Sequence, residues 1–194
     1  MDLLISSLSN NMLSTPLVSL TSTTFDILTG TSINSQVVGT DGLTSINSQV
    51  VGTDGLTSTT LDILTGTLIN SQVVGTNESL ININSNGSYN KTIITGDGND
   101  YINAGMGNDT ITSGAGSDIF AFGSPLEGVD TITDFSSEQG DKIQISAAGF
   151  GIGANDFGRF AYDAATGGLY FDNTQLATLP LNLPFDSTTN ITIV

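Results

Sequence analysis

Three aspartates, Asp100, Asp109 and Asp118, follow one another at a constant spacing of nine residues. They lie in the segment TGDGNDYINAGMGNDTITSGAGSDIF, residues 95–120, where each comes two residues after a glycine and two residues before a bulky apolar side chain. A short, constant repeat period is typical of stacked folds, in which successive copies of one unit lie on top of each other. The segment therefore predicts a repetitive β-structure whose turns present a carboxylate at regular intervals.

The charge balance indicates what these carboxylates bind. The 194 residues include 19 Asp and Glu but only 3 Lys and Arg, so the formal net charge is −16. Nucleic acids and anionic membranes bind basic patches, and neither is expected as a partner. Membrane insertion is not expected either, because no apolar run approaches the roughly 20 residues of a membrane span. Cations are the natural counterpart of such a chain.

The residue types that are missing exclude most catalytic chemistry. The chain has neither Cys nor His. Disulfides, the usual zinc ligands and His-based triads are therefore ruled out. The sequence also lacks the H-E-x-x-H and G-x-S-x-G motifs of metalloproteases and serine hydrolases. We do not expect an enzyme.

The first half of the chain carries longer repeats. TSINSQVVGTDGL occurs at 31–43 and again at 44–56, and STTFDILTGT at 22–31 returns as STTLDILTGT at 58–67. Short alternating pieces such as Ile33–Val37 end in Gly-Thr or Asp-Gly, which predicts short strands and tight turns. We interpret residues 22–85 as degenerate coils of one stacked solenoid, larger than the later coils. A disordered Ser/Thr/Asn-rich linker is the alternative.

The contiguous nonapeptides resemble the calcium-binding repeat of RTX proteins, G-G-x-G-x-D-x-U-x, where U is bulky and apolar. A small residue, Thr95, Ala104 or Ser113, stands at the first glycine of each copy. A decayed copy, NGSYNKTII, precedes them and has Lys91 where the aspartate would be, so we expect it to bind nothing. The copies are TGDGNDYIN (95–103), AGMGNDTIT (104–112) and SGAGSDIFA (113–121).

The resemblance implies an all-β chain that forms a right-handed parallel β-roll, or β-solenoid, with two nonapeptides per coil. Turns that are two nonapeptides apart would then clamp Ca²⁺ between them, so Asp100 and Asp118 should share a site, while Asp109 faces the degenerate turn at 122–127. Ca²⁺ takes six to eight oxygen ligands, which turn carbonyls and carboxylates supply. The implied calcium residues of the repeats are Gly96, Gly98, Asp100, Gly105, Gly107, Asp109, Gly114, Gly116 and Asp118.

The same arrangement predicts the core and the register of the repeats. Ile93 should stack on Ile111, and Ile102 on Phe120. The copies of STTFDILTGT begin at 22 and 58, an offset of four nonapeptides or two such coils, so these copies should lie in register. The shorter offset between the copies of TSINSQVVGTDGL does not fit such a coil.

The last third of the chain resembles the region that follows the repeats in RTX proteins exported by type I secretion systems, of Gram-negative and cyanobacterial type. The segment GVDTITDFSSEQGDKIQIS (128–146) adds Asp130, Asp134 and Asp141 as implied calcium ligands, with solvated turn carboxylates as the alternative for each. The segment RFAYDAATGGLYFD (159–172) predicts a β-hairpin that caps the last coil.

The two ends of the chain differ in what they suggest about export. The final LPFDSTTNITIV resembles the uncleaved C-terminal export signal of the same family. The initial MDLLISSLSNNM has an acidic residue where a secretory signal is positive, so no N-terminal signal is expected. Four regions follow from these patterns: an apolar N-terminal cap or assembly arm (1–21), degenerate solenoid repeats (22–85), the calcium-binding β-roll (86–127), and a C-terminal cap with the secretion region (128–194).

The expected function is structural. We expect an extracellular or cell-surface calcium-binding protein that assembles with itself into a filament, sheath or surface layer, with the type I secretion machinery as its other partner. The alternative is a monomeric calcium-dependent adhesion module that binds a surface or ice. The TGT steps at 29–31 and 65–67 suggest this alternative.

Overall fold

The computed structural model describes the strands at 22–25, 32–37, 45–51, 58–63, 69–75 and 80–85 and every residue from 90 to 194. Side chains are described for 82–85 and from residue 90 onward. The expected N-terminal cap or assembly arm (1–21) and the TGT steps lie outside the described residues.

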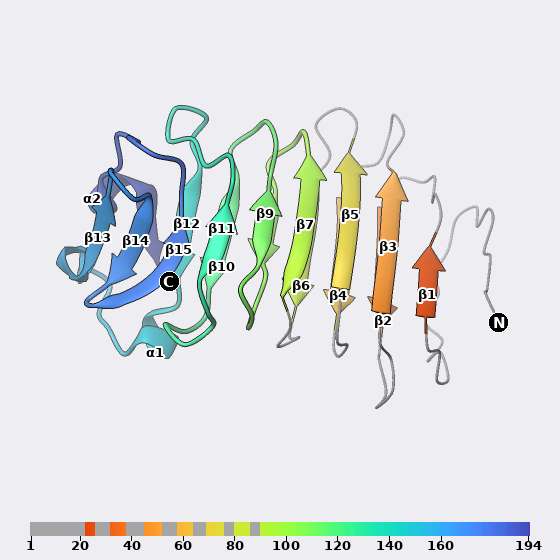
Figure 1. The fold of residues 1–194 in the computed structure, drawn as a ribbon, viewed down its shortest axis with the longest axis horizontal. Coiled ribbons are helices and arrows are strands. Elements are labelled where there is room, and N and C mark those ends of the chain that lie inside the picture. Colours follow the sequence, from red (N-terminus) through yellow and green to blue (C-terminus); the bar gives the residue numbers. More distant parts are fainter. Residues whose placement is uncertain are drawn as a thin grey trace.

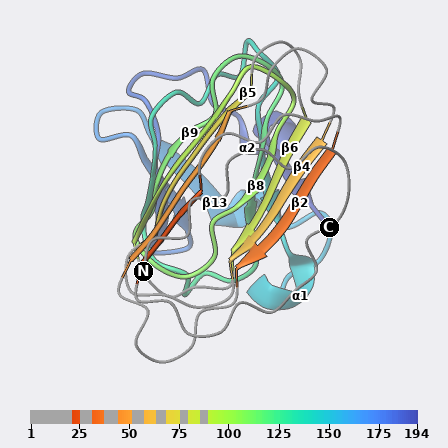
Figure 2. The same ribbon diagram turned by 90° about the vertical axis from the view of Figure 1, so that its right-hand side faces the viewer.

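Up to residue 145 the described strands alternate between two sheets along the chain, and Figure 1 shows them as one continuous stack. Seen along the stack in Figure 2, the two sheets face each other. Within the described residues one sheet has nine strands, in the order β1 (Ser22–Phe25), β3 (Ser45–Val51), β5 (Ile69–Gly75), β7 (Lys91–Gly96), β9 (Thr110–Thr112), β11 (Asp130–Ile132), β15 (Thr174–Thr178), β14 (Gly168–Phe171) and β13 (Phe160–Asp163). The other has seven, in the order β16 (Ile191–Ile193), β12 (Lys142–Ile145), β10 (Ile119–Phe122), β8 (Tyr101–Asn103), β6 (Leu80–Ser85), β4 (Ser58–Ile63) and β2 (Ser32–Val37).

Helices are few and short in the described residues: α1 (Ala147–Phe150), the 3₁₀ turn η1 (Phe157–Arg159) and α2 (Ser187–Asn190). None of them has the length and apolar character needed to cross a membrane. The all-β prediction is confirmed.

Consecutive strands of one sheet are parallel through the coils, and their register measures the length of each coil. Thr92 pairs with Thr110 and Ile102 with Phe120, so each coil of the repeats consists of two nonapeptides, as predicted. The coils before them are longer, as expected: Ser32 pairs with Ser58, and Ile46 with Ile69. The coils after them lengthen again, since Thr110 pairs with Thr131, and Ile119 with Lys142.

The predicted register of the N-terminal repeats is wrong. The copies at 22–31 and 58–67 contain β1 and β4, which belong to different sheets, so the offset between them is not a whole number of coils. The repeat TSINSQVVGTDGL instead matches half a coil. Its two copies contain the successive strands β2 and β3, and Ser32 of β2 pairs with Ser58 of β4, which is two repeat lengths further along the chain. The error came from applying the coil of two nonapeptides to strands of six or seven residues.

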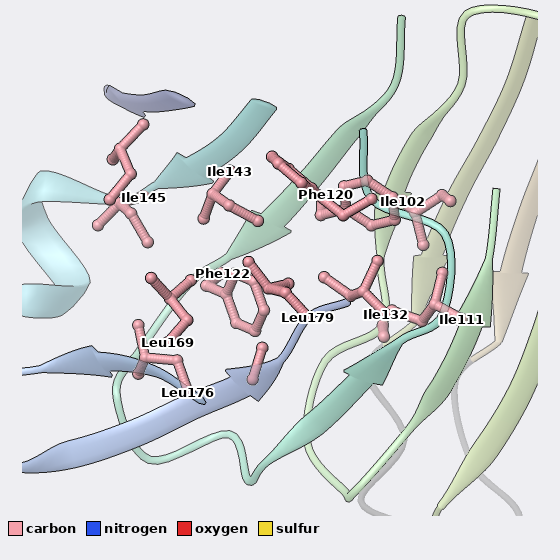
Figure 3. Close-up of a cluster of buried hydrophobic side chains, with 14 of the residues drawn as sticks. Ile102, Ile111, Phe120, Phe122, Ile132, Ile143, Ile145, Leu169, Leu176 and Leu179 are labelled. Carbon is pink, nitrogen blue, oxygen red and sulfur yellow. The ribbon is translucent and has the colours of Figure 1, made fainter. Parts of the chain in front are cut away.

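The bulky apolar positions of the nonapeptides form the core, as predicted. Ile93 pairs with Ile111 in one sheet and Ile102 with Phe120 in the other, and each of these side chains is 1–2% exposed. Figure 3 shows Ile102, Ile111 and Phe120 between the sheets, together with residues of the following coil and the C-terminal strands. Burial of each such side chain contributes roughly 1.5–3 kcal/mol. The core between the two sheets thus stabilises the stack of coils, and the turns lie at the two sides of the stack.

The C-terminal third completes both sheets. The predicted hairpin is confirmed: β13 and β14 are antiparallel, with Phe160 opposite Phe171. Next to β14 lies β15, which is parallel to β11, so these three strands extend the nine-stranded sheet. The last strand, β16, is parallel to β12 and extends the other sheet, with Ile143 beside Ile191.

Candidate calcium centre in the stacked turns

The turns of the repeats form two stacks, one on each side of the molecule. Each coil crosses from the nine-stranded sheet to the seven-stranded sheet through one turn and returns through another. The residues at the aspartate position then line up in two series. We call Asp100, Asp118 and Asp141 the Asp118 ladder, and Lys91, Asp109 and Asp130 the Asp109 ladder.

The Asp118 ladder is a continuous chain of hydrogen bonds from coil to coil. The backbone N–H of Asp100 donates to Asp118 Oδ1 at 2.9 Å, and the N–H of Asp118 donates to Asp141 Oδ1 at 3.0 Å. All three residues are buried, with exposed fractions of 0–1%. The structure thus brings Asp100 and Asp118 together and places Asp141 at the same position of the next coil.

The Asp109 ladder repeats this geometry on the other side. The N–H of Lys91 donates to Asp109 Oδ1 at 2.7 Å, and the N–H of Asp109 donates to Asp130 Oδ1 at 2.9 Å. The segment 122–127, expected opposite Asp109, supplies the Glu127 carbonyl, which accepts from the Gly107 N–H at 2.7 Å. The carboxylate facing Asp109 comes from Asp130, three residues beyond that carbonyl.

Glycine lets consecutive turns approach so closely that no side chain fits between them. Gly116 has a φ of +141°, and a Cβ built on it would lie 1.7 Å from the carbonyl oxygen of Gly98. Gly114 stands in the same relation to Gly96, at 2.2 Å. Such φ values and contacts are open to glycine alone. The predicted glycines of the repeats all have positive φ: Gly96, Gly98, Gly105, Gly107, Gly114 and Gly116.

A further glycine in the stacked turns was missed. Gly128 has a φ of +125°, and its Cβ would lie 2.0 Å from the carbonyl oxygen of Gly107. It precedes Asp130 by two residues, as Gly98 precedes Asp100, so the G-x-D spacing was the available signal.

The turns hold buried carboxylate oxygens that accept no hydrogen bond. Oδ2 of Asp109 and Oδ2 of Asp118 have no hydrogen-bond partner among the residues that the structure describes. A buried, unsatisfied oxygen costs about 1–3 kcal/mol, and more if it is charged. In high-resolution structures such an atom points to an ion or water that satisfies it. These two oxygens are therefore suited to bind a cation.

Burial also disfavours the charged form of these carboxyl groups. It raises the pKa of Asp109 to about 6, against the opposing charge of Lys91, and the pKa of Asp141 to about 6. Burial raises the pKa of Asp130 to about 8 and raises that of Asp118 as well. A bound cation would remove this penalty and keep the carboxylates ionised.

The donor set fits calcium. No three acidic side chains of the described residues converge on one point, so most ligands of an ion here would have to be backbone carbonyls. The Met106 carbonyl lies beside the Asp109 carboxylate, since both contact Lys91 Nζ. Neutral carbonyl oxygens with one or two carboxylates are the set that Ca²⁺ accepts. Zinc, which favours His and Cys, finds neither residue type in the chain.

Asp134 has a different environment from the ladder aspartates. Its Oδ1 accepts from the N–H of Ser113 at 3.1 Å, and its Oδ2 from the N–H of Gly114 at 2.7 Å. Both oxygens thus hold the amides at the start of the neighbouring turn. A role as calcium ligand stays a prediction for this residue.

Asparagine side chains also support the turns, and sequence reasoning missed them. The residue before the aspartate position supplies an amide oxygen to the next coil: Asn90 Oδ1 accepts from the Asn108 N–H at 2.9 Å, and Asn99 Oδ1 from the Ser117 N–H at 2.8 Å. Asn108 Oδ1 accepts in turn from the Val129 N–H at 2.9 Å. The recurring Asn-Asp pair was the signal for this role.

Comparison with known proteins identifies the repeats. Residues 86–120 match the family model of the RTX calcium-binding nonapeptide repeat (4 copies). No curated protein and no solved structure matches the chain. The predicted RTX repeats are confirmed on these residues, and with them calcium as the bound ion.

Proposed function

We propose that this protein is a secreted calcium-binding β-solenoid with a structural rather than a catalytic role, which folds outside the cell and assembles with further copies of itself into a filament, sheath or surface layer. The observation that carries the proposal is the pair of buried carboxylate ladders, with open oxygens, along a continuous stack of two sheets. The stack is a right-handed β-roll, and the β13–β14 hairpin with β15 caps its C-terminal end.

The calcium ligands in this proposal come from stacked turns. Asp100, Asp109 and Asp118 supply carboxylates, and the turn glycines supply carbonyl oxygens. Asp130 and Asp141 extend the two ladders by one coil, because each accepts the same backbone hydrogen bond as the aspartates of the repeats. The ion would neutralise carboxylates that otherwise repel one another across the stack.

Self-assembly is suggested by the open ends of the two sheets. Within the described residues, β1 and β2 are the outermost strands at one end, and β13 and β16 at the other. An outermost strand has unpaired backbone groups, which can add a strand from another chain. Residues 1–21, MDLLISSLSNNMLSTPLVSLT, have one charged side chain and many apolar ones, so they are suited to such an addition. A second copy of this chain is thus the proposed partner.

Assembly is expected to depend on residues 1–21. In millimolar calcium the full-length protein should form large particles, and deletion of 1–21 should abolish them without changing calcium binding. Light scattering and calcium titration measure the two effects. A monodisperse full-length monomer in millimolar calcium would contradict assembly and favour the monomeric adhesion module.

Export is proposed to use the C-terminal region. The resemblance of residues 128–194 to type I export regions supports this, and so does the low calcium of the cytosol. Without calcium the buried carboxylates repel one another and oppose folding of the repeats, so the chain stays unfolded before it leaves the cell.

In cells that carry a type I exporter, deletion of residues 136–194 should retain the protein inside the cell, whereas deletion of 1–21 should not. The measurement is the ratio of protein in the medium to protein in the cells. Secretion that persists after the C-terminal deletion would rule out the type I route.

A further inference from the structure

Lys91 stands at the aspartate position of the decayed repeat copy at 86–94. Its backbone N–H donates to Asp109 Oδ1 at 2.7 Å, as the N–H of Asp100 donates to Asp118 Oδ1. The hydrogen-bond pattern thus confirms that Lys91 belongs to the Asp109 ladder. The same copy has Tyr89 where the intact copies have a glycine before the aspartate, so both calcium-binding features of the motif are replaced together.

The Lys91 ammonium group points into the stacked turns and not toward solvent. Its Nζ donates to the carbonyl oxygen of Met106 at 2.7 Å and lies 3.2 Å from Asp109 Oδ1. The side chains of Lys91 and Asp109 are both 0% exposed. A lysine is almost never fully buried unless its charge is paired. The carboxylate of Asp109 and the carbonyl of Met106 are the partners that compensate the buried charge of Lys91.

The oxygens around this ammonium are of the kinds that calcium binds. One is the carbonyl of a repeat turn, at the third position of the nonapeptide 104–112. The other is the carboxylate of that nonapeptide. In the Asp118 ladder the corresponding third-position carbonyl, that of Ala115, accepts from the N–H of Gly98 at 2.8 Å. Met106 and Ala115 therefore hold equivalent carbonyls, and the carbonyl of Met106 accepts a hydrogen bond from the Lys91 ammonium.

We propose that the Lys91 ammonium is a tethered cation that replaces a calcium ion at the N-terminal boundary of the calcium-binding repeats. The inference rests on the proposed calcium sites between stacked turns. It makes the first position of the Asp109 ladder independent of calcium, whereas the Asp118 ladder begins with the carboxylate of Asp100. The ammonium of Lys91, which is part of the chain, then stabilises the junction between the degenerate coils and the calcium-binding coils.

The decisive experiment restores the motif. A double variant, Tyr89→Gly with Lys91→Asp, converts residues 86–91 to the pattern of an intact copy. In the full-length chain it should bind one more calcium ion than the wild type, as counted by native mass spectrometry and by calorimetric titration. An unchanged ion count would overturn the proposal. A wild type that binds no calcium would instead refute the proposed sites themselves, so the two failures are distinguishable.

A second variant tests the charge without creating a site. Lys91→Met keeps an unbranched side chain, one heavy atom shorter, but removes its charge, and it should lower Tm in saturating calcium by roughly 5–10 °C, because Asp109 is left buried without its ammonium partner. Lys142→Met is the matched control, since Lys142 is partly exposed and its ammonium donates to the carbonyl of Thr189. Equal Tm values for the two variants would overturn the role of Lys91.

Discussion

Chelation of calcium should remove much of the β-structure of this protein, and millimolar calcium should restore it. The reason is the accumulation of buried aspartates in two ladders, whose charges oppose folding until an ion neutralises them. We expect an affinity on the order of 10⁻⁴ to 10⁻³ M, the range of extracellular calcium modules. Far-ultraviolet circular dichroism during a titration with chelator and then calcium measures the effect. A spectrum unaffected by the chelator would falsify calcium-coupled folding.

Two aspartates of the repeats provide the internal control. Asp118 is buried and belongs to the Asp118 ladder, whereas Asp97 is exposed and lies in the turn that contains Asp100. Asp118→Ala should shift the calcium midpoint of folding by tenfold or more, since it removes a ligand and an acceptor worth about 1.5–3 kcal/mol. Asp97→Ala should leave the midpoint nearly unchanged. Equal shifts would show that the ions are bound elsewhere on the turns.

Gly116→Ala should be among the most destabilising single substitutions in the repeats. The added Cβ would lie 1.7 Å from the carbonyl oxygen of Gly98, at a φ of +141° that L-residues rarely adopt. Both the strain and the forced separation of the turns oppose folding, so we expect a loss of about 3 kcal/mol or more. The separation also moves the carbonyl oxygens, so more calcium should be needed for folding. Urea unfolding at fixed calcium and calcium titration measure the two effects.

Gly158→Ala is the matched control for that substitution. Gly158 lies in η1, and a Cβ built there has no atom within 4 Å. The free energy of unfolding should change by no more than about 0.5 kcal/mol. If both alanine variants unfold at the same urea concentration, the close approach of the turns does not limit stability.

The repetitive part of the fold could be predicted because one period decides several features at once. A nine-residue repeat places the turn glycines, the aspartate and the apolar residue at equivalent positions of every half coil. The pairing of Ile102 with Phe120 followed from that period and from the two-nonapeptide coil that the resemblance implies. The N-terminal register did not, because its coils have longer strands and no strict period. There the repeat TSINSQVVGTDGL was the better guide, and it signalled half a coil.

The candidate site was predictable only in its carboxylates and glycines. Asp130 and Asp141 were expected from a resemblance, but their alignment with Asp109 and Asp118 depends on coils that are longer than two nonapeptides. The role of Asn99 was missed although the recurring Asn-Asp pair signalled it, because the partner of its side-chain oxygen is a backbone N–H of the next coil. Lys91 was interpreted as the mark of an inactive copy. In the structure the Lys91 ammonium is buried against Asp109 and the Met106 carbonyl. The replacement of the aspartate thus removes a carboxylate and adds a positive charge at the same place.

The hydrogen-bond chain of the Asp118 ladder has a consequence for how the protein senses its surroundings. The Asp118 carboxylate accepts a hydrogen bond from the backbone N–H of Asp100 in one neighbouring coil. The backbone N–H of Asp118 donates in turn to the carboxylate of Asp141 in the other neighbouring coil. An ion that orders one turn therefore also positions the donor and acceptor of its neighbours, as in one-dimensional systems with nearest-neighbour coupling. Occupancy should then rise steeply over a narrow range of calcium concentration. The molecule would then respond to calcium as a threshold switch rather than as a graded buffer.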